Sequence, residues 1–267
     1  MKNFPCFVIN LEKDVSKKLL MQDECKKVGI NPIFTNAIYG AHLSNTEINK
    51  VYSKEDAVKY FNRELTKGEI GTALSHLHIY KYIVDKSIPY ALVLEDDVEL
   101  PDNIKQLTNI LYKLPNDWEI VLLGHHTGRS RTIDTLASVW NQYKVDNKYR
   151  CIRFAEDPFG AYGYLISING ARKLLKQFSL IDRPIDHWND KTVNLYGINP
   201  SFIIVNDEFI SDSLLLQERS DMLTARTLFQ KFKDMVQKML KRLNLFEMYF
   251  SIKNFLLQFK NPRRYES

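Results

Sequence analysis

Cysteine is scarce in this sequence of 267 residues, and long apolar runs are missing from it. The three cysteines, Cys6, Cys25 and Cys151, lie far apart without a CxxC pair, which argues against a disulfide framework or a zinc site. The apolar run at residues 4–9 is far shorter than the roughly 20 residues of a membrane span, and no signal-peptide pattern surrounds it. We therefore expect a reducing, cytoplasmic setting, with neither a secretion signal nor a spanning helix.

Most of the chain carries no excess of positive charge, and the excess that exists lies at its end. The net charge is +5, and residues 221–267 alone hold 10 Lys or Arg against 4 Asp or Glu, which leaves residues 1–220 close to neutral. A nucleic-acid-binding protein normally carries its basic patch on the folded domain, so this distribution argues against nucleic acid as a partner. We predict a globular domain over residues 1–220 and a basic helical tail over residues 221–267.

Apolar, β-rich runs alternate with helical patterns along the body, and 45% of the residues are hydrophobic, enough for a sizeable core. Helices are predicted at residues 15–28, 44–61, 66–87, 103–112 and 168–178. Strands are predicted at residues 4–11, 32–40, 91–94, 118–124 and 162–167, with a last strand before residue 206. Such alternation indicates an α/β fold with a mostly parallel sheet covered on both faces.

Three adjacent carboxylates, Glu95, Asp96 and Asp97, end the apolar strand at residues 91–94. Charges this close repel by about 1 kcal/mol per pair even in water. In an extended strand Glu95 and Asp97 share one side and Asp96 points away. Ligands of α/β sheets bind at the carboxyl ends of strands, and hard cations prefer oxygen ligands, so the triplet predicts a Mg²⁺ or Mn²⁺ site. The alternative is a helix cap or a solvated turn.

The start of the helix predicted at residues 66–87 has two interpretations. Thr66 with Glu69 three residues later fits a capping box, which satisfies two backbone amides at a helix start. A glycine-flanked helix start can also approach a phosphate or a sugar closely, with Gly68 and Gly71 making room. Both interpretations stay open at the level of sequence.

Five more polar residues are candidates for the site. Ser75 and His76 follow one to two turns along the same helix, and His76 is either a ligand contact or a helix histidine with internal partners. Asn10 ends the first strand and is either a nucleotide contact or a turn former. His125 follows a strand with His126, but the pair lacks metal-ligand spacing to another His or Cys.

Three stretches, FVINLEKDVSKKLLMQDECKKVGINPIFTNAIYG, GEIGTALSHLHIYKYIVDKSIPYALVLEDDVEL and GAYGYLISINGARKLL, resemble in order those of glycosyltransferase family 25. This family comprises lipooligosaccharide and lipopolysaccharide galactosyltransferases of Gram-negative bacteria, and the resemblance covers about residues 4–220. It implies a GT-A-like, Rossmann-type fold, a UDP-sugar donor, usually UDP-galactose, and transfer with inversion to a β-glycoside. One departure is that Lys17 and Lys18 stand where many members have an arginine pair, which removes bidentate binding of a diphosphate there.

The resemblance also implies roles for individual residues. The family's Glu-Asp-Asp falls on Glu95, Asp96 and Asp97, so that Glu95 and Asp97 would hold Mn²⁺ or Mg²⁺ and Asp96 would contact the donor's ribose or sugar. Asp186 matches the family's Pro-Val-Asp pattern and is the candidate general base; the alternative is an N-cap of a helix that Pro184 initiates. The expected donor contacts are Asn10, Gly68, Glu69, Ser75, His76 and Asp96, with Gln217, Ser220 and Asp221 near the donor.

The basic tail carries a strongly amphipathic pattern. Residues 228–243 place apolar side chains on one arc of a helical wheel and mainly Lys and Arg on the other, and a second apolar stretch covers residues 245–259. This pattern predicts peripheral docking on the anionic inner face of a bacterial cytoplasmic membrane, where a lipid-linked oligosaccharide acceptor would be found. The alternatives are a hairpin packed on the core or a homodimer contact. The alternative function is a non-catalytic, membrane-associated sugar- or nucleotide-binding scaffold.

Overall fold

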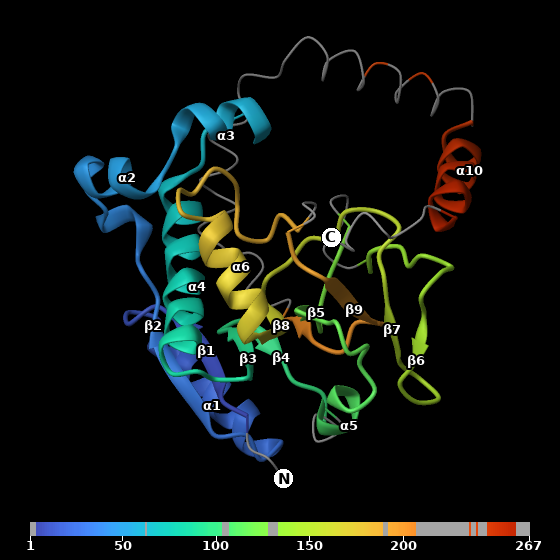
Figure 1. Cartoon of the computed structure of the whole chain (residues 1–267), viewed down its shortest axis with the longest axis horizontal. Helices are drawn as coiled ribbons and strands as arrows, with labels where there is room; N and C mark the ends of the chain where they lie inside the picture. The colour runs from blue at the N-terminus through green and yellow to red at the C-terminus, as the bar shows by residue number, and fades with distance from the viewer. Residues whose placement is uncertain are drawn as a thin grey trace.

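The computed structural model of this chain describes residues 4–61, 63–102, 107–127, 133–188, 192–206, 235, 239 and 245–259. One mixed sheet of eight strands, in the order β2-β1-β3-β8-β5-β9-β7-β6, forms its centre (Figure 1). These strands are β1 (Cys6–Asn10), β2 (Pro32–Asn36), β3 (Tyr90–Glu95), β5 (Ile120–Leu122), β6 (Tyr143–Lys144), β7 (Arg150–Ile152), β8 (Gly163–Ser167) and β9 (Leu195–Asn199). A separate two-stranded ladder joins β4 (Val98–Glu99) to β10 (Ile204–Val205).

Two strands, β8 and β7, run opposite to the other six. The prediction of a mostly parallel sheet is therefore correct for strand direction, but β8 lies between β3 and β5 and is antiparallel to both. Its first residue, Gly163, pairs with Leu94 near the end of β3. The chain thus enters β8 at the same edge of the sheet at which β1 and β3 end.

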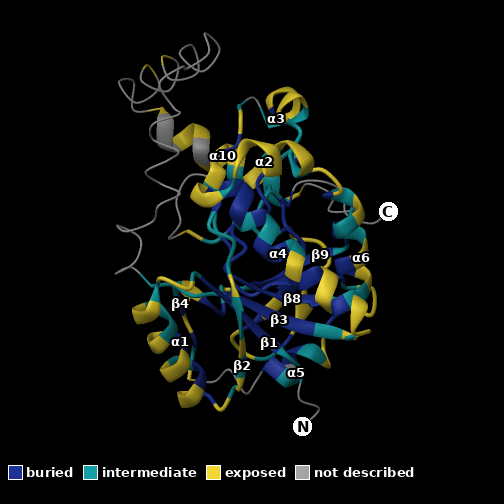
Figure 2. Ribbon diagram, turned by 90° about the vertical axis from the view of Figure 1, so that its left-hand side faces the viewer, coloured by how far each residue is buried: buried dark blue, intermediate teal, exposed yellow. Residues whose placement is uncertain are grey.

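Helices cover both faces of the sheet, as predicted (Figure 2). On one face lie α4 (Lys67–Asp85) and α6 (Ile168–Gln177), and on the other lie α1 (Val15–Lys27) and α5 (Leu107–Leu111). The side-chain alternation of β1 separates the two cores: Phe7 and Ile9 pack in the cluster that contains residues of α4 and α6, while Cys6 and Val8 pack with residues of α1. The short helices η1 (Gly40–His42), α2 (Asn45–Val51) and α3 (Lys54–Phe61) connect β2 to α4.

Local sequence signals explain several element ends. Gly29 follows α1 with φ of 71°, the left-handed conformation that glycine adopts without strain, so α1 ends where the sequence predicts. The Ser167 side chain accepts a hydrogen bond from the backbone N–H of Gly170 and caps α6. Cys6, Cys25 and Cys151 are free and buried.

The tail is described mainly through α10 (Phe246–Gln258). The helix predicted at residues 228–243 lies outside the described residues except for Met235 and Met239, which are helical and exposed. The end of α10 contacts the body, because the backbone N–H of Val139 donates to the carbonyl oxygen of Gln258 at 2.9 Å. Among the described residues, no helix is both long and apolar enough to cross a membrane.

Candidate active site

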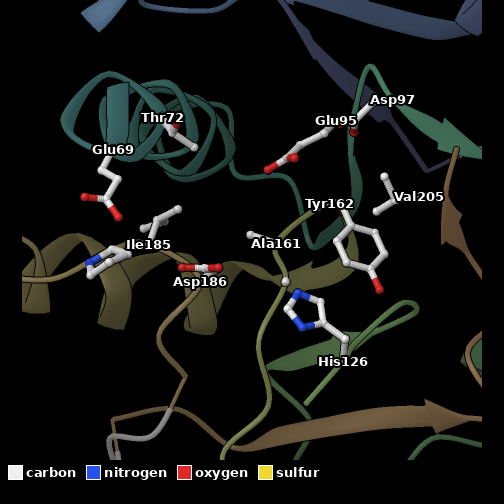
Figure 3. Close-up of a pocket in the computed structure, with 12 residues that line it drawn as sticks. Glu69, Thr72, Glu95, Asp97, His126, Ala161, Tyr162, Ile185, Asp186 and Val205 are labelled. Carbon is white, nitrogen blue, oxygen red and sulfur yellow. The ribbon is translucent and has the colours of Figure 1, made fainter. Parts of the chain in front are cut away.

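One pocket opens at the edge of the sheet at which β1 and β3 end and β8 begins (Figure 3). Six separate parts of the chain form its walls: the first turns of α4, the end of β3 with the turn after it, the chain after β5, the segment before β8, the turn at residues 184–186 and β10. The lining residues are Glu69, Thr72, Glu95, Asp97, His126, Gly160, Ala161, Tyr162, Pro184, Ile185, Asp186 and Val205. The pocket therefore brings together four of the acidic residues that the sequence singles out, Glu69, Glu95, Asp97 and Asp186.

The acidic triplet divides between two sides of the strand end. Glu95 is the last residue of β3, and both Glu95 and Asp97 line the pocket. Asp96 faces away from it: its Oδ2 accepts a hydrogen bond of 2.7 Å from the side-chain amide of Asn10, and its Oδ1 lies 3.6 Å from Nζ of Lys17. The predicted division of the side chains is thus observed, but its expected cause is wrong, because Asp96 and Asp97 form the turn between β3 and β4 rather than an extended strand.

The surroundings of Asp96 offset part of the electrostatic repulsion among the three carboxylates. Burial raises the pKa of Asp96, while the positive charge of Lys17 and the hydrogen bond from Asn10 act in the opposite direction. Asn10 and Lys17 therefore stabilise the central carboxylate, and Glu95 and Asp97 remain as a pair in the pocket. If Lys17 were to bind the donor diphosphate, it would have to give up this contact with Asp96.

The pair of carboxylates fits a hard divalent cation better than a zinc ion. Among the residues that the structure describes, no three His, Cys, Asp or Glu side chains are grouped so that they could hold a metal. Zinc sites use three or four protein ligands, with nitrogen and sulfur common among them. Mg²⁺ instead is held through one or two carboxylates together with phosphate oxygens and water. Glu95 and Asp97 match that second pattern.

Asp186 lies across the pocket from the triplet, and Figure 3 shows its carboxylate directed toward the same space as that of Glu95. Residues 185–186 form a turn, closed by a hydrogen bond from the His187 N–H to the Pro184 carbonyl. The alternative of an N-cap is not supported, because residues 182–188 form no helix. The turn is held in place by Trp188, whose indole Nε1 donates to the Gly160 carbonyl at 2.9 Å.

Glu69 has a structural role and also faces the pocket. It forms the predicted capping box with Thr66, since each side chain accepts a hydrogen bond from the other's backbone N–H. Its two oxygens also accept bonds of 2.6 and 2.7 Å from the guanidinium of Arg63. A carboxylate with these partners is only 2% exposed and is held rigidly in the pocket wall.

Gly68, Gly71 and Ser75 do not line the pocket. A Cβ on Gly71 would lie 2.5 Å from the carbonyl oxygen of Ile38, so this glycine serves close packing of α4 rather than approach to a ligand. The Ser75 hydroxyl donates to the Gly71 carbonyl and accepts from the Ile38 N–H. The interpretation of Gly71 as room for a phosphate or sugar is thus replaced by a packing role, and the buried Ser75 hydroxyl is committed to backbone partners.

His76 also lies outside the pocket wall and is fully buried. Its Nδ1 lies 2.7 Å from the hydroxyl of Tyr164, and its Nε2 lies 3.5 Å from Oε1 of Glu95. The sequence predicts that His76 contacts the donor sugar, but such a contact would require this buried ring to be accessible. The structure instead places His76 behind Glu95.

The neighbouring histidines His125 and His126 differ in environment. His125 is buried, its Nδ1 accepts from the backbone N–H of Thr135, and its Nε2 lies 3.0 Å from the carbonyl oxygen of Ile198. Burial lowers the pKa of His125 to about 4, so the ring is neutral near pH 7. His126 lines the pocket and stacks on Tyr162 with an interplanar angle of 3°. Both ring nitrogens of His125 have backbone partners, so the two rings do not share a metal site.

Several pocket residues have no signal in the sequence analysis, among them Tyr162, Ile185 and Val205. Tyr162 and its neighbours reach the pocket because β8 is antiparallel to β3, and Val205 does so through the pairing of β10 with β4. In the sequence, the stretch GAYG before β8 indicates only the start of a strand and a part of the family resemblance. Gln217, Ser220 and Asp221, expected near the donor, lie outside the described residues.

Comparison with known proteins gives matches over most of this body. The model of glycosyltransferase family 25, described as an LPS biosynthesis protein family, matches residues 3–188. Procollagen galactosyltransferase 1-A of Xenopus laevis is 28% identical over 191 residues, which are 68% of this chain and 30% of that protein. A glycosyltransferase 25 family member of Aedes aegypti is 28% identical over 177 residues, or 64% of this chain and 28% of its own length.

A solved structure is also similar in part. It is the crystal structure of a glycosyltransferase involved in the glycosylation of the major capsid of PBCV-1, with a TM-score of 0.34 and 12% identity over 66% of this chain and 65% of that one. These two relatives are much longer proteins, and this chain spans less than a third of the length of each.

Proposed function

Since the chain belongs to glycosyltransferase family 25, we propose that it transfers a hexose, galactose first among the candidates, from a UDP-sugar to a hydroxyl group of an oligosaccharide. The observation that carries this proposal is the single pocket shared by Glu95, Asp97 and Asp186 at the edge where β1 and β3 end. Nucleotides bind at this edge of α/β sheets. Galactose is supported by the relatives named procollagen galactosyltransferase.

The proposed reaction is a single displacement at the anomeric carbon. The acceptor hydroxyl attacks C1 of the sugar while the bond from C1 to the UDP oxygen breaks, and UDP leaves with the bonding electron pair. Asp186 takes the proton of the hydroxyl as the new C1–O bond forms. Attack from the side opposite to UDP inverts the anomeric centre, so an α-linked donor gives a β-glycoside.

Glu95 and Asp97 are the proposed holders of Mg²⁺ or Mn²⁺, which when bound supplies positive charge to the departing diphosphate. Their two carboxylates would leave the remaining coordination positions to phosphate oxygens and water. Asn10 and Asp96, joined at the neighbouring strand ends, are proposed to contact the ribose or sugar of the donor. Glu69 is proposed to border the donor's sugar, because its rigid carboxylate faces the pocket beside Thr72.

The proposed acceptor is a lipid-linked lipooligosaccharide or lipopolysaccharide, in line with the LPS biosynthesis named in the family description. We propose that the tail docks on the anionic inner face of a bacterial cytoplasmic membrane. Two features support this: α10 exposes Ile252, Phe255 and Leu256 by more than half, and residues 221–267 carry the surplus of Lys and Arg. Apolar insertion and attraction to anionic lipid reinforce each other in such helices.

One observation favours a second candidate, a non-catalytic sugar- or nucleotide-binding scaffold at the membrane. Two of the expected donor contacts, Ser75 and His76, lie outside the pocket wall. The two candidates differ in turnover, because a scaffold binds a donor without consuming it.

A donor panel tests the proposal on the full-length protein. UDP-galactose, UDP-glucose and UDP-N-acetylglucosamine are offered with truncated oligosaccharide acceptors, in the presence of Mn²⁺ and then with a chelator. We expect UDP release that depends on both acceptor and Mn²⁺, with UDP-galactose preferred and a β-linkage in the product by NMR. Binding of UDP without consumption of any donor would instead establish the scaffold.

A further inference from the structure

A buried chain of polar side chains runs from the core of the body to the acidic pair in the pocket. Tyr80 and His76 lie on α4 and Tyr164 lies on β8, and all three are fully buried. The hydroxyl of Tyr164 lies 2.7 Å from the hydroxyl of Tyr80 and 2.7 Å from Nδ1 of His76. The imidazole ring stacks on Tyr164 with centroids 5.8 Å apart, which fixes its plane.

The hydrogens in this chain can be assigned from its chemistry. Burial raises the pKa of Tyr80 and of Tyr164, so both phenols keep their hydrogens. One hydroxyl carries one hydrogen, and Tyr164 has two partners, so it accepts from one of them and donates to the other. If Tyr80 donates to Tyr164 and Tyr164 donates to Nδ1 of His76, a neutral ring carries its hydrogen on Nε2. The reverse order would leave a bare Nε2 lone pair facing the carboxylate of Glu95, which is unfavourable.

The Nε2 atom of His76 is buried and makes no hydrogen bond of normal geometry within the described part of the chain. The carboxylate oxygen Oε1 of Glu95 lies 3.5 Å from it, just beyond ordinary hydrogen-bond length. Glu95 is 31% exposed at its side chain and can rotate, whereas His76 is fixed by burial, stacking and Tyr164. A buried donor without a partner costs free energy, so it favours the rotamers of Glu95 that bring Oε1 closer.

We infer that His76 is a positioning residue for Glu95: its Nε2–H holds one carboxylate oxygen and thereby turns the other toward the pocket. This inference deepens the proposed function, because it rests on Glu95 being one of the two carboxylates that hold the divalent cation. It also changes the role of His76 from a donor contact to a group that acts through Glu95. Outer partners of this kind orient ligands and tune their affinity for a metal.

Two substitutions of His76 separate the contact with Glu95 from the contact with Tyr164. In His76→Gln, the side-chain NH₂ can reach the former position of Nε2 and donate to Glu95. In His76→Asn, the shorter amide stays near the former position of Nδ1 and loses Glu95. We expect His76→Asn to weaken Mn²⁺ binding by about 10- to 100-fold, as removal of an outer partner typically does. We expect His76→Gln to recover most of that loss.

Non-additivity provides the matched control for these variants. The double variant His76→Asn with Glu95→Gln should bind Mn²⁺ no more weakly than Glu95→Gln alone, since His76 acts only through that carboxylate. Calorimetry with Mn²⁺ alone measures these affinities without donor or acceptor. Equal losses in His76→Asn and His76→Gln, or an additive double variant, would overturn the inference.

Ring ¹⁵N NMR of the full-length protein tests the contact independently of metal and of turnover. We expect His76 to carry its hydrogen on Nε2, and we expect Glu95→Gln to move the Nε2 resonance while the Nδ1 resonance stays. A ring protonated only on Nδ1, or an Nε2 resonance indifferent to Glu95→Gln, overturns the inference even in an active enzyme. If the NMR result holds and the protein consumes no donor, the glycosyltransferase proposal fails while the positioning of Glu95 stands.

Discussion

The side-chain amide of Asn10 donates a hydrogen bond of 2.7 Å to the carboxylate of Asp96, and so joins the ends of the parallel strands β1 and β3. Lys17 approaches the same carboxylate from α1 at 3.6 Å. Asp96 is thereby compensated within the fold, and the acidic triplet leaves only Glu95 and Asp97 to share the pocket. This division determines what removal of one carboxylate should do to stability and to activity.

Asp97→Ala is expected to abolish metal-dependent transfer and to leave the fold intact. Removing one of two neighbouring carboxylates relieves repulsion, so the Tm without metal should be unchanged or slightly higher. We expect Mn²⁺ to raise the Tm of the parent protein and not that of the variant, because ligand binding stabilises only a protein that holds the ligand. Thermal denaturation with and without Mn²⁺ measures both effects.

Glu99→Ala is the matched control, since Glu99 is an exposed carboxylate two residues further along the same segment. It should keep both the activity and the Mn²⁺ effect. Metal-dependent transfer by Asp97→Ala would remove Asp97 from the proposed metal site.

Asp186→Asn should lower kcat by roughly 100-fold or more, the usual contribution of a general base, and should change donor affinity little. The amide has nearly the same shape as the carboxylate but cannot take up the acceptor's proton. Steady-state kinetics combined with calorimetric titration of UDP separates the two quantities. Asp23→Asn, on the exposed side of α1, is the control for a carboxylate far from the pocket. A loss of UDP affinity with turnover preserved would make Asp186 a binding residue.

The buried, neutral His125 predicts a loss of stability in mild acid. Its pKa is lowered to about 4 by burial, whereas an unfolded histidine titrates near 6.5, so the unfolded chain binds more protons between these two values. The contribution to the free energy of unfolding is complete above about pH 6.5 and is lost as the pH falls toward 4. A shift of this size corresponds to on the order of 3 kcal/mol.

Urea denaturation of the parent protein and of His125→Gln measures this effect. The pH should run from about 7.5 to about 4, so that it passes the pKa of histidine in the unfolded chain and reaches that of His125 in the folded protein. The variant should be less stable at neutral pH and should depend less on pH over the acidic half of the range. His78→Gln is the control, because His78 is exposed on α4. An equal pH dependence in the parent and in His125→Gln would exclude His125 as its source.

The tail predicts salt-sensitive binding to anionic vesicles. Phe255→Glu and Leu256→Glu place charges on exposed apolar positions of α10 and should weaken binding of the full-length protein to phosphatidylglycerol-containing vesicles. Transfer to a soluble acceptor should remain. Ser251→Glu changes charge equally at an exposed polar position of the same helix and serves as the control.

Deletion of residues 227–267 extends this experiment to the whole tail. On the membrane hypothesis the truncated protein stays folded, no longer binds vesicles and still glycosylates a soluble acceptor. Precipitation of the truncated protein, or indifference of the full-length protein to anionic vesicles at low salt, would assign the tail to the core or to a homodimer contact.

The features predicted well from the sequence are those set by near neighbours along the chain. The alternation of β1 and β3, the capping box of Thr66 with Glu69 and the left-handed Gly29 follow from patterns of two to four residues. The division of the acidic triplet agrees with the prediction only in its outcome, because residues 96–97 form a turn and not the extended strand from which the division was predicted.

The features that could not be predicted depend on pairings between distant segments. Nothing local indicates that β8 enters the sheet antiparallel to β3, and so nothing local places Tyr162 beside His126 in the pocket. The sequence suggests that His76 lies near the donor, because it follows Glu69 within two turns of the same helix. The first turns of α4 border the pocket, however, and one turn later the same helix is enclosed by β8, where Tyr164 binds His76.

Glu69 both lines the pocket and stabilises the start of α4, and this limits how substrate selection can change in this fold. Any replacement of Glu69 would reshape one wall of the pocket and would also remove the capping box and the partner of Arg63, so a new sugar preference gained there carries a loss of folding stability. Val205, in contrast, borders the pocket from the short strand β10 with a side chain that takes part in no such cap or ion pair. A change of donor or acceptor preference should therefore cost less folding stability at Val205 than at the start of α4.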